Sequence, residues 1–216
     1  MLKKAIVGDV HGDAGRLVSL LSKPELRERE LIFTGDLVNR GPDSRGVLEK
    51  VAELVFDKKI ARVLLGNHEL LLLDFIDNGN FVGLAMGGGI ATIKSYVGVA
   101  YGNVHQQFVE AFPREHLSLL RNANIYYEDG DVLVTHAGVS RADPSSRDVR
   151  DVVTGSHPEL FAGDFDVGKL LVCGHYVQRV GLPFVSPHFV CVDTGCGTVG
   201  GPLTAFLLPE RTFIQS

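Results

Sequence analysis

Long apolar segments, paired cysteines and an excess of basic residues are all missing from this chain of 216 residues. No apolar run approaches the roughly 20 residues that a membrane-spanning helix needs. The first residues lead into a predicted strand, without the apolar segment of a signal peptide. We therefore expect neither a membrane anchor nor a membrane partner.

The three cysteines, Cys173, Cys191 and Cys196, are an odd number and contain no CxxC pair. This pattern does not suit a disulfide framework, and it favours buried thiols in a reducing cytoplasm. The net charge of −5 argues against a nucleic-acid partner, which normally meets a basic surface. It says little about a substrate that binds to metal ions, because the metals supply positive charge locally.

Apolar residues make up 45% of the chain and charged residues 22%, which is enough for a full globular core. The length suits one domain, and we find no internal repeat or low-complexity tract. We predict a single domain over residues 1–216.

Apolar, β-branched segments at residues 3–8, 31–34 and 60–65 alternate with three amphipathic segments. These begin near Ala14, at Asp43 or Ser44, and near Asn67, and they read as helices. The order strand, helix, strand, helix, strand, helix predicts a mainly parallel sheet covered on both faces.

The later part of the chain is less regular. Residues 70–123 are predicted to form a helical insertion beside the site. A hairpin follows over residues 125–127 and 132–135, and further strands are predicted at residues 170–173, 189–192 and 203–208.

Polar side chains recur just after the predicted strands. They lie in the runs Gly8-Asp9-Val10-His11-Gly12, Gly35-Asp36-Leu37-Val38-Asn39-Arg40-Gly41 and Gly66-Asn67-His68-Glu69, and at His136 and His175. Singly, each has an ordinary structural explanation: a turn aspartate, a helix cap or a core histidine. Ligands of α/β proteins bind at the carboxyl ends of the strands of the sheet, which is where these residues are predicted to lie. The structural explanations do not require polar side chains at all five of these strand ends. Together they therefore indicate one site.

The residue types fit a pair of divalent metal ions. Such a pair needs a bridging carboxylate, for which Asp36 is the natural choice. Asp9 and His11 would complete the ligands of one ion. The other ion would take Asn67, His136 and His175. Mixed oxygen and nitrogen donors suit Mn²⁺, or else Fe or Zn, better than Ca²⁺ or Mg²⁺.

A metal pair of this kind activates a shared water for direct attack on phosphorus. His68 follows the ligand Asn67 and is predicted to act as general acid toward the leaving group. Arg40 lies one short turn from Asp36 and is predicted to clamp phosphoryl oxygens. The alternative for His68 is a surface histidine at the start of a helix, and the alternative for Arg40 is a solvated loop charge.

The runs GDVHG, GDLVNRGPDS, GNHE, THAG and CGH occur in this order from Gly8 onward. In this respect the chain resembles the phosphoprotein-phosphatase branch of the calcineurin-like metallophosphoesterases, including its small bacterial and bacteriophage-lambda-type members. The resemblance implies a four-layer α/β/β/α sandwich of two mixed sheets. It also implies the metal ligands named above, a catalytic role for His68 and Arg40, and a second phosphate-binding arginine, for which Arg150 is the candidate and Arg147 the alternative.

Two residues beside the predicted ligands bear on the substrate. Glu69, in GNHE, favours a serine/threonine protein phosphatase, which is the leading prediction. Asn39 stands where that branch usually has an aspartate. The run Asn39-Arg40-Gly41-Pro42, together with Asp193-Thr194-Gly195-Cys196, resembles symmetrical diadenosine tetraphosphate hydrolases, which give the alternative function. A non-catalytic module that keeps the fold is a third possibility. The expected substrate is a phosphorylated protein or a small phosphoester.

Overall fold

The computed structural model describes residues 3–99, 101–163, 165–178 and 180–216, so Met1 and Leu2, at the predicted lead-in to the first strand, lie outside the described part. The described residues form two five-stranded sheets. The first sheet has the strand order β10-β9-β1-β2-β3, and the second has the order β4-β5-β6-β8-β7.

The first sheet consists of β1 (Lys4–Val7), β2 (Glu30–Phe33), β3 (Ala61–Val63), β9 (Thr204–Leu208) and β10 (Thr212–Gln215). Strands β1, β2 and β3 are parallel to one another, whereas β9 is antiparallel to both β1 and β10. The second sheet consists of β4 (Tyr126–Glu128), β5 (Val132–Thr135), β6 (Leu170–Cys173), β7 (Phe184–Val185) and β8 (Phe189–Cys191). Here β5, β6 and β8 are parallel.

Helices connect and cover these strands. They are α1 (Ala14–Leu21), α2 (Ser44–Ala52), α3 (Asn67–Asn78), α4 (Phe81–Met86), α5 (Ile90–Val97), α6 (Val104–Ala111), α7 (Arg114–Arg121) and α8 (Val149–Val152). Single turns add 3₁₀ helices at Pro24–Leu26 and Pro158–Ala162 and a π-helical turn at Glu53–Asp57. Among the described residues, no helix combines the length and apolar character that crossing a membrane requires.

Alternation along each strand decides which side chains lie between the sheets. Ile6 of β1 and Phe206 of β9 point inward, where they join Val134 and Val172 of the second sheet in one apolar cluster. The neighbouring residues on the same strands point outward, because side chains alternate along a strand. On the first sheet they pack under α1, α2 and α7, and on the second under α8 and the turn at residues 158–162.

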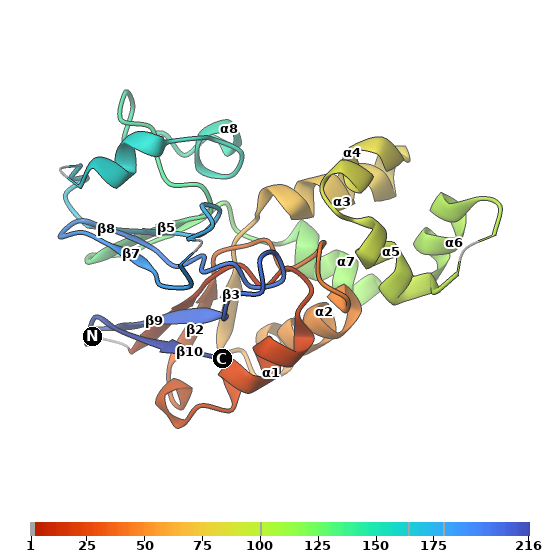
Figure 1. Cartoon of the computed structure of the whole chain (residues 1–216), viewed down its shortest axis with the longest axis horizontal. Helices are drawn as coiled ribbons and strands as arrows, with labels where there is room; N and C mark the ends of the chain where they lie inside the picture. Colours follow the sequence, from red (N-terminus) through yellow and green to blue (C-terminus); the bar gives the residue numbers. More distant parts are fainter. Residues whose placement is uncertain (1–2, 100, 164, 179) are drawn as a thin grey trace.

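The result is a sandwich with helices outside two facing sheets. Figure 1 shows α8 above the second sheet and α1 below the first, with α2 beside the first sheet and α3 to α6 extending to the same side. This confirms the four-layer α/β arrangement that the resemblance implied.

The single covered sheet predicted from the residue pattern alone is wrong. Strands near residues 132, 170 and 189 pair with one another and not with the first three strands. The pattern could not reveal this, because every one of these strands is buried on both faces in either arrangement. The short strand β7 and the edge strand β10 were not predicted. The helix predicted near Asn67 begins at that residue and runs to Asn78.

The layer between the sheets can be tested through Phe206, which is 1% exposed. Replacing a buried phenylalanine by alanine removes apolar contacts and leaves a cavity, so Phe206→Ala should lower the free energy of unfolding by about 3–5 kcal/mol. Chemical denaturation measures this change. Tyr101→Ala is the control, since Tyr101 is 80% exposed, and a similar loss in both variants would contradict the described core.

Candidate metal centre

The two sets of parallel strands bring their carboxyl ends to one place. Asp9 and His11 follow β1, Asp36 follows β2, and Asn67 begins the helix after β3. The second sheet contributes His136 after β5 and His175 after β6. All six predicted metal ligands therefore lie where the parallel strands of both sheets end, the usual place for an α/β site.

Several of these residues have unusual backbone conformations. His11, Asp36, Asn39, Arg40 and His175 have φ values of 45°, 51°, 71°, 68° and 66°. Residues other than glycine rarely adopt this left-handed region, and each instance costs about 1–3 kcal/mol. Such strain persists only where surrounding contacts hold it in place, and here it is concentrated in the predicted site.

The Glu69 carboxylate holds the turn that carries Asp36. Its Oε2 accepts hydrogen bonds from the backbone N–H groups of Gly66 and Asp36 at 2.9 and 2.7 Å. Its Oε1 accepts from those of Leu37 and Val38 at 2.8 and 3.3 Å. Glu69 is completely buried. One charged group thus satisfies four buried backbone donors and locks two strand ends together.

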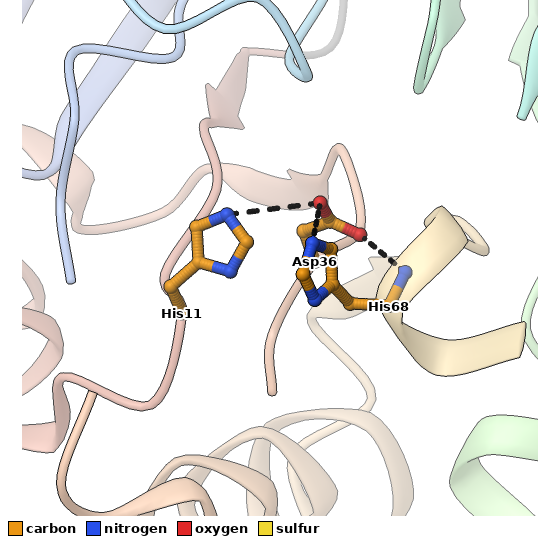
Figure 2. Close-up of side chains that lie close together, drawn as sticks. All are labelled: His11, Asp36 and His68. Carbon is orange, nitrogen blue, oxygen red and sulfur yellow. Dashed lines mark hydrogen bonds and ion pairs between the residues drawn. The ribbon is translucent and has the colours of Figure 1, made fainter. Parts of the chain in front are cut away.

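Asp36 lies at the centre of the site. Its Oδ1 accepts a hydrogen bond from the backbone N–H of His68 at 2.9 Å. Figure 2 shows the imidazoles of His11 and His68 aimed at the other oxygen, Oδ2. The distances from Oδ2 to the Nε2 atoms of His11 and His68 are 3.7 and 3.8 Å, and that to Nε2 of His136 is 3.5 Å. A single carboxylate oxygen therefore faces both halves of the site.

The second half of the site is a tight group of three side chains. Asn67 Oδ1 lies 3.0 Å from both His136 Nε2 and His175 Nδ1, and these two nitrogens are 3.2 Å apart. The Asn67 side chain is therefore not used as a helix cap. It points at the two histidines, as its predicted role as a ligand requires.

Backbone carbonyls set the protonation of two histidines. His11 Nδ1 donates to the carbonyl of Val38 at 3.2 Å, and His136 Nδ1 donates to that of Thr34 at 3.0 Å. In a neutral imidazole this leaves a lone pair on Nε2, the atom that faces Asp36 in both cases. Outer hydrogen bonds of this kind orient histidine ligands toward a metal.

The donor set fits divalent metal ions. Two groups of side chains, His11–Asp36–His68 and Asp36–His136–His175, place their nitrogen and oxygen atoms within 4.8 Å of one another, and Asp36 belongs to both. Buried lone pairs at this spacing repel one another unless a proton or a cation lies between them. Imidazole nitrogen with carboxylate and amide oxygen is the donor mixture of first-row transition metals.

The pKa shifts of these groups also indicate a site for cations. Burial, together with neighbouring carboxylates, raises the pKa of Asp9 and of Asp36 well above the ordinary range. Burial is the main cause that lowers the pKa of His11 and of His136 well below the ordinary histidine range, and neighbouring histidines, with Arg40 in the case of His11, lower it further. Crowded carboxylates flanked by uncharged imidazoles make a site that added positive charge would stabilise.

His68 occupies a different position from the other histidines. It is 2% exposed, so the alternative of a surface histidine is wrong. Asn39 Nδ2 donates to His68 Nδ1 at 3.0 Å, while Asn39 Oδ1 accepts from the Thr92 hydroxyl at 2.8 Å. His68 Nδ1 is thus an acceptor, and its proton is on Nε2, the nitrogen that faces Asp36. This tautomer can donate a proton or hydrogen bond into the site but presents no lone pair there.

Arg40 lies at the entrance to the site and is exposed. Its Nη1 donates to His11 Nε2 at 3.2 Å, and its backbone N–H donates to the carbonyl of Gly88 at 3.1 Å. Burial is the main cause that lowers the pKa of His68 and of His175, and the nearby Arg40 guanidinium lowers the pKa of both further. Arg40 is the cation that the sequence predicts beside the proposed metal ligands.

The structure does not bring the second predicted arginine to the same place. The Arg150 side chain is 87% exposed and pairs with Asp148 at 3.0 Å. Arg147 pairs with Glu128 and stacks on Tyr126. A role for Arg150 at the phosphate therefore stays a prediction that requires its side chain to leave Asp148.

Sequence reasoning missed Asp193, which follows β8 and is completely buried. Its Oδ1 accepts from the backbone N–H of Gly195 at 3.0 Å, while Oδ2 has no hydrogen-bond partner among the described residues. Its charge contributes to the raised pKa of Asp9. The signal was present, because Asp193 is another polar residue directly after an apolar strand.

Two glycines make room for the carboxylates. A Cβ on Gly174 would lie 1.9 Å from Asp9 Oδ1, and one on Gly66 would lie 2.2 Å from Asp36 Oδ1. Both distances are far below van der Waals contact, so any larger residue would displace the carboxylate.

Comparison with known proteins agrees with this geometry. The sequence model that describes the calcineurin-like phosphoesterases matches residues 2–179. The chain belongs to the calcineurin-like phosphoesterase family. A protein of Oceanobacillus iheyensis named bis(5'-nucleosyl)-tetraphosphatase PrpE [asymmetrical] is 31% identical over 99% of this chain and 92% of its own length.

Solved structures share the fold of this phosphoesterase. A metallophosphoesterase from Sphaerobacter thermophilus has a TM-score of 0.61 at 17% identity, covering 99% of this chain and 88% of its own. A protein serine/threonine phosphatase from Saccharomyces cerevisiae has a TM-score of 0.56 at 14% identity, covering 100% of this chain and 79% of its own. The family implies a metal-dependent phosphoester hydrolase with a divalent metal pair.

When bound, such a pair lowers the pKa of a shared water and polarises phosphoryl oxygens. The chain's own residues do the rest. Arg40 is predicted to neutralise charge on the phosphoryl group, and His68 is predicted to present its N–H toward the same space. Burial of the ligands keeps their geometry fixed.

Replacing Glu69 by glutamine should weaken both the fold and the site. An amide has one acceptor oxygen instead of two, so the backbone donors around it lose charge-assisted hydrogen bonds worth about 1.5–3 kcal/mol each. We expect Glu69→Gln to lower the free energy of unfolding by at least about 2 kcal/mol and to reduce metal content, measured by denaturation and elemental analysis. The exposed Glu49→Gln should change neither. Unchanged stability in Glu69→Gln would exclude the anchoring role.

His68→Asn and Asn67→Ala should have different effects although the residues are neighbours. Loss of a general acid should lower kcat in His68→Asn by about 10²–10⁴ with metal content unchanged. Asn67→Ala should instead lose metal. Elemental analysis beside kinetics with p-nitrophenyl phosphate distinguishes them, and loss of metal in His68→Asn would make His68 a ligand.

Proposed function

We propose that this phosphoesterase hydrolyses dinucleoside polyphosphates, cleaving them asymmetrically. The observation that carries the proposal is the buried cluster around Asp36. Beside it stands the similarity of nearly the whole chain to a relative named as an asymmetrical tetraphosphatase. The cluster supports the reaction class, and the relative supports the substrate class.

The proposed metal ligands are the six polar residues that follow the parallel strands. Asp9, His11 and Asp36 would hold one ion, and Asp36 with Asn67, His136 and His175 the other. Mn²⁺ is the proposed metal, with Fe or Zn as alternatives, because the donor set mixes imidazole with carboxylate and amide oxygens. The three cysteines are all buried and unpaired, which fits activity in a reducing cytoplasm.

The prediction of a serine/threonine protein phosphatase rested on the set of motifs, on Glu69 and on the compact length, and among these Glu69 was the residue that favoured it over the tetraphosphate hydrolase. In the structure Glu69 binds four backbone N–H groups, and its oxygens face the chain itself. The residue therefore has a structural task whatever the substrate, and it carries little weight in the choice between substrates.

Asn39 favours the anhydride substrate. It is the partner of His68 and carries no charge, so it cannot balance an imidazolium as a carboxylate would. A phosphoanhydride leaves as a phosphate oxyanion, which needs a proton far less than the alkoxide of serine or threonine. A site with a neutral partner for its proton donor suits the better leaving group.

A side-by-side assay tests the proposal. The protein with Mn²⁺ is given diadenosine tetraphosphate or a phosphoserine peptide, and products are separated by ion-exchange chromatography. We expect faster turnover of the tetraphosphate, to ATP and AMP. Two molecules of ADP would support the symmetrical alternative, and faster release of phosphate from the peptide would support the protein phosphatase. No turnover of either, together with no bound metal, would indicate a binding module.

A further inference from the structure

Two hydroxyl groups meet beside Asn39, the partner of His68. Ser44 begins α2, and Thr92 lies on α5 of the helical insertion. Their side-chain oxygens are 2.8 Å apart, and the backbone N–H of Asn39 lies 3.1 Å from Ser44 Oγ and 3.0 Å from Thr92 Oγ1. All three residues are completely buried. Each hydrogen of this group therefore has to find its acceptor within the protein.

The hydrogen bonds of the two hydroxyls run in one direction. A hydroxyl donates one hydrogen and accepts with two lone pairs. The Thr92 hydroxyl donates to Asn39 Oδ1 at 2.8 Å, so the hydrogen between the two hydroxyls comes from Ser44. Every hydroxyl hydrogen then has an acceptor. The Asn39 amide nitrogen is left to donate to His68 Nδ1 at 3.0 Å.

The reverse orientation of the Asn39 amide leaves a buried hydrogen without an acceptor. The amide nitrogen would then donate to Thr92 Oγ1, and the Thr92 hydroxyl would have to donate to Ser44. Within the described part of the chain, Ser44 Oγ has only the Thr92 hydroxyl and the Asn39 N–H within hydrogen-bond distance, so its own hydrogen would be unpaired. An unpaired buried donor is costly. The two hydroxyls therefore select one orientation of the amide.

We propose that Thr92, oriented by Ser44, is a positioning residue that keeps the ring proton of His68 on Nε2. With the Asn39 amide reversed, its oxygen would accept from His68 Nδ1, and the bare Nε2 would face the carboxylate of Asp36. Thr92 thereby links the helical insertion to the predicted proton donor. The proposal applies to any phosphoester and does not depend on the proposed dinucleoside substrate.

Nitrogen NMR of protein labelled in its histidine rings locates the proton, because protonated and bare ring nitrogens resonate far apart. Zn²⁺ is the metal for this measurement, since it is not paramagnetic, and the His68 signals are those missing in His68→Asn. We expect the proton on Nε2. Thr92→Val should shift the ratio of the two forms by about 5- to 150-fold toward Nδ1, the cost of leaving one buried polar group unpaired. Thr92→Ser should keep the proton on Nε2. A proton on Nδ1 in the unaltered protein, or no shift in Thr92→Val, would overturn the proposal.

Kinetics with p-nitrophenyl phosphate separate positioning from packing. Thr92→Val should lower kcat by about 3- to 30-fold with metal content unchanged, less than His68→Asn does, because part of the protein keeps the present orientation. In an Asn39→Asp background both side-chain oxygens accept, so there is no amide orientation to select. Adding Thr92→Val to that background should change kcat by less than about 2-fold. An equal fall in both backgrounds would make Thr92 a packing residue and overturn the proposal.

Ser95→Ala is the matched control on the same helix. The Ser95 hydroxyl donates to the carbonyl of Thr92 at 2.8 Å and accepts from the backbone N–H of Arg45 at 3.2 Å. Its removal takes a hydroxyl from α5 without touching the Asn39 side chain. The His68 proton and kcat should both be unchanged, and a loss equal to that of Thr92→Val would contradict the specific role of the Thr92 hydroxyl.

Discussion

The buried carboxylate of Glu69 is the constraint on which the rest of the site depends. It accepts four backbone N–H groups from two strand ends, and in doing so it satisfies donors that a buried turn would otherwise leave unpaired. Burial raises the pKa of this carboxyl, and its hydrogen bonds to the backbone oppose the rise. The energy gained there holds Asp36 in a left-handed conformation that its own backbone disfavours.

From Asp36 the arrangement spreads to both sheets. Its carboxylate faces His11 from the first sheet and His136 from the second, so the packing of one sheet on the other sets the distance between the two halves of the site. The apolar layer around Ile6 and Phe206 is therefore a condition for the chemistry as well as for the fold. Outer carbonyls then turn each imidazole so that a lone pair faces Asp36.

Much of this could be predicted from the sequence, because polar residues after apolar strands mark the carboxyl ends of a sheet. That rule found Asp9, Asp36 and His136 without any knowledge of their partners. It could not show that the strands form two sheets, since residues buried on both faces look alike in either case. It also gave no sign that Arg150 lies against Asp148, because a flexible surface side chain has no periodic pattern.

Glu69 and Asn39 show a further limit of prediction from the sequence. Each was compared with family patterns as a mark of substrate, but only coordinates reveal that Glu69 binds backbone and that Asn39 fixes the tautomer of His68. The residues that bear on substrate choice then become Asn39 and the helix that touches it. This moves the question of specificity from the motifs to the insertion between β3 and β4.

Crystals grown with Mn²⁺ and measured at a wavelength with strong manganese anomalous scattering would test the central claim directly. The account predicts two anomalous peaks about 3.5–4 Å apart, with the Asp36 carboxylate between them and Asn67, His136 and His175 around one. A single peak, or two peaks that do not share Asp36, would contradict it.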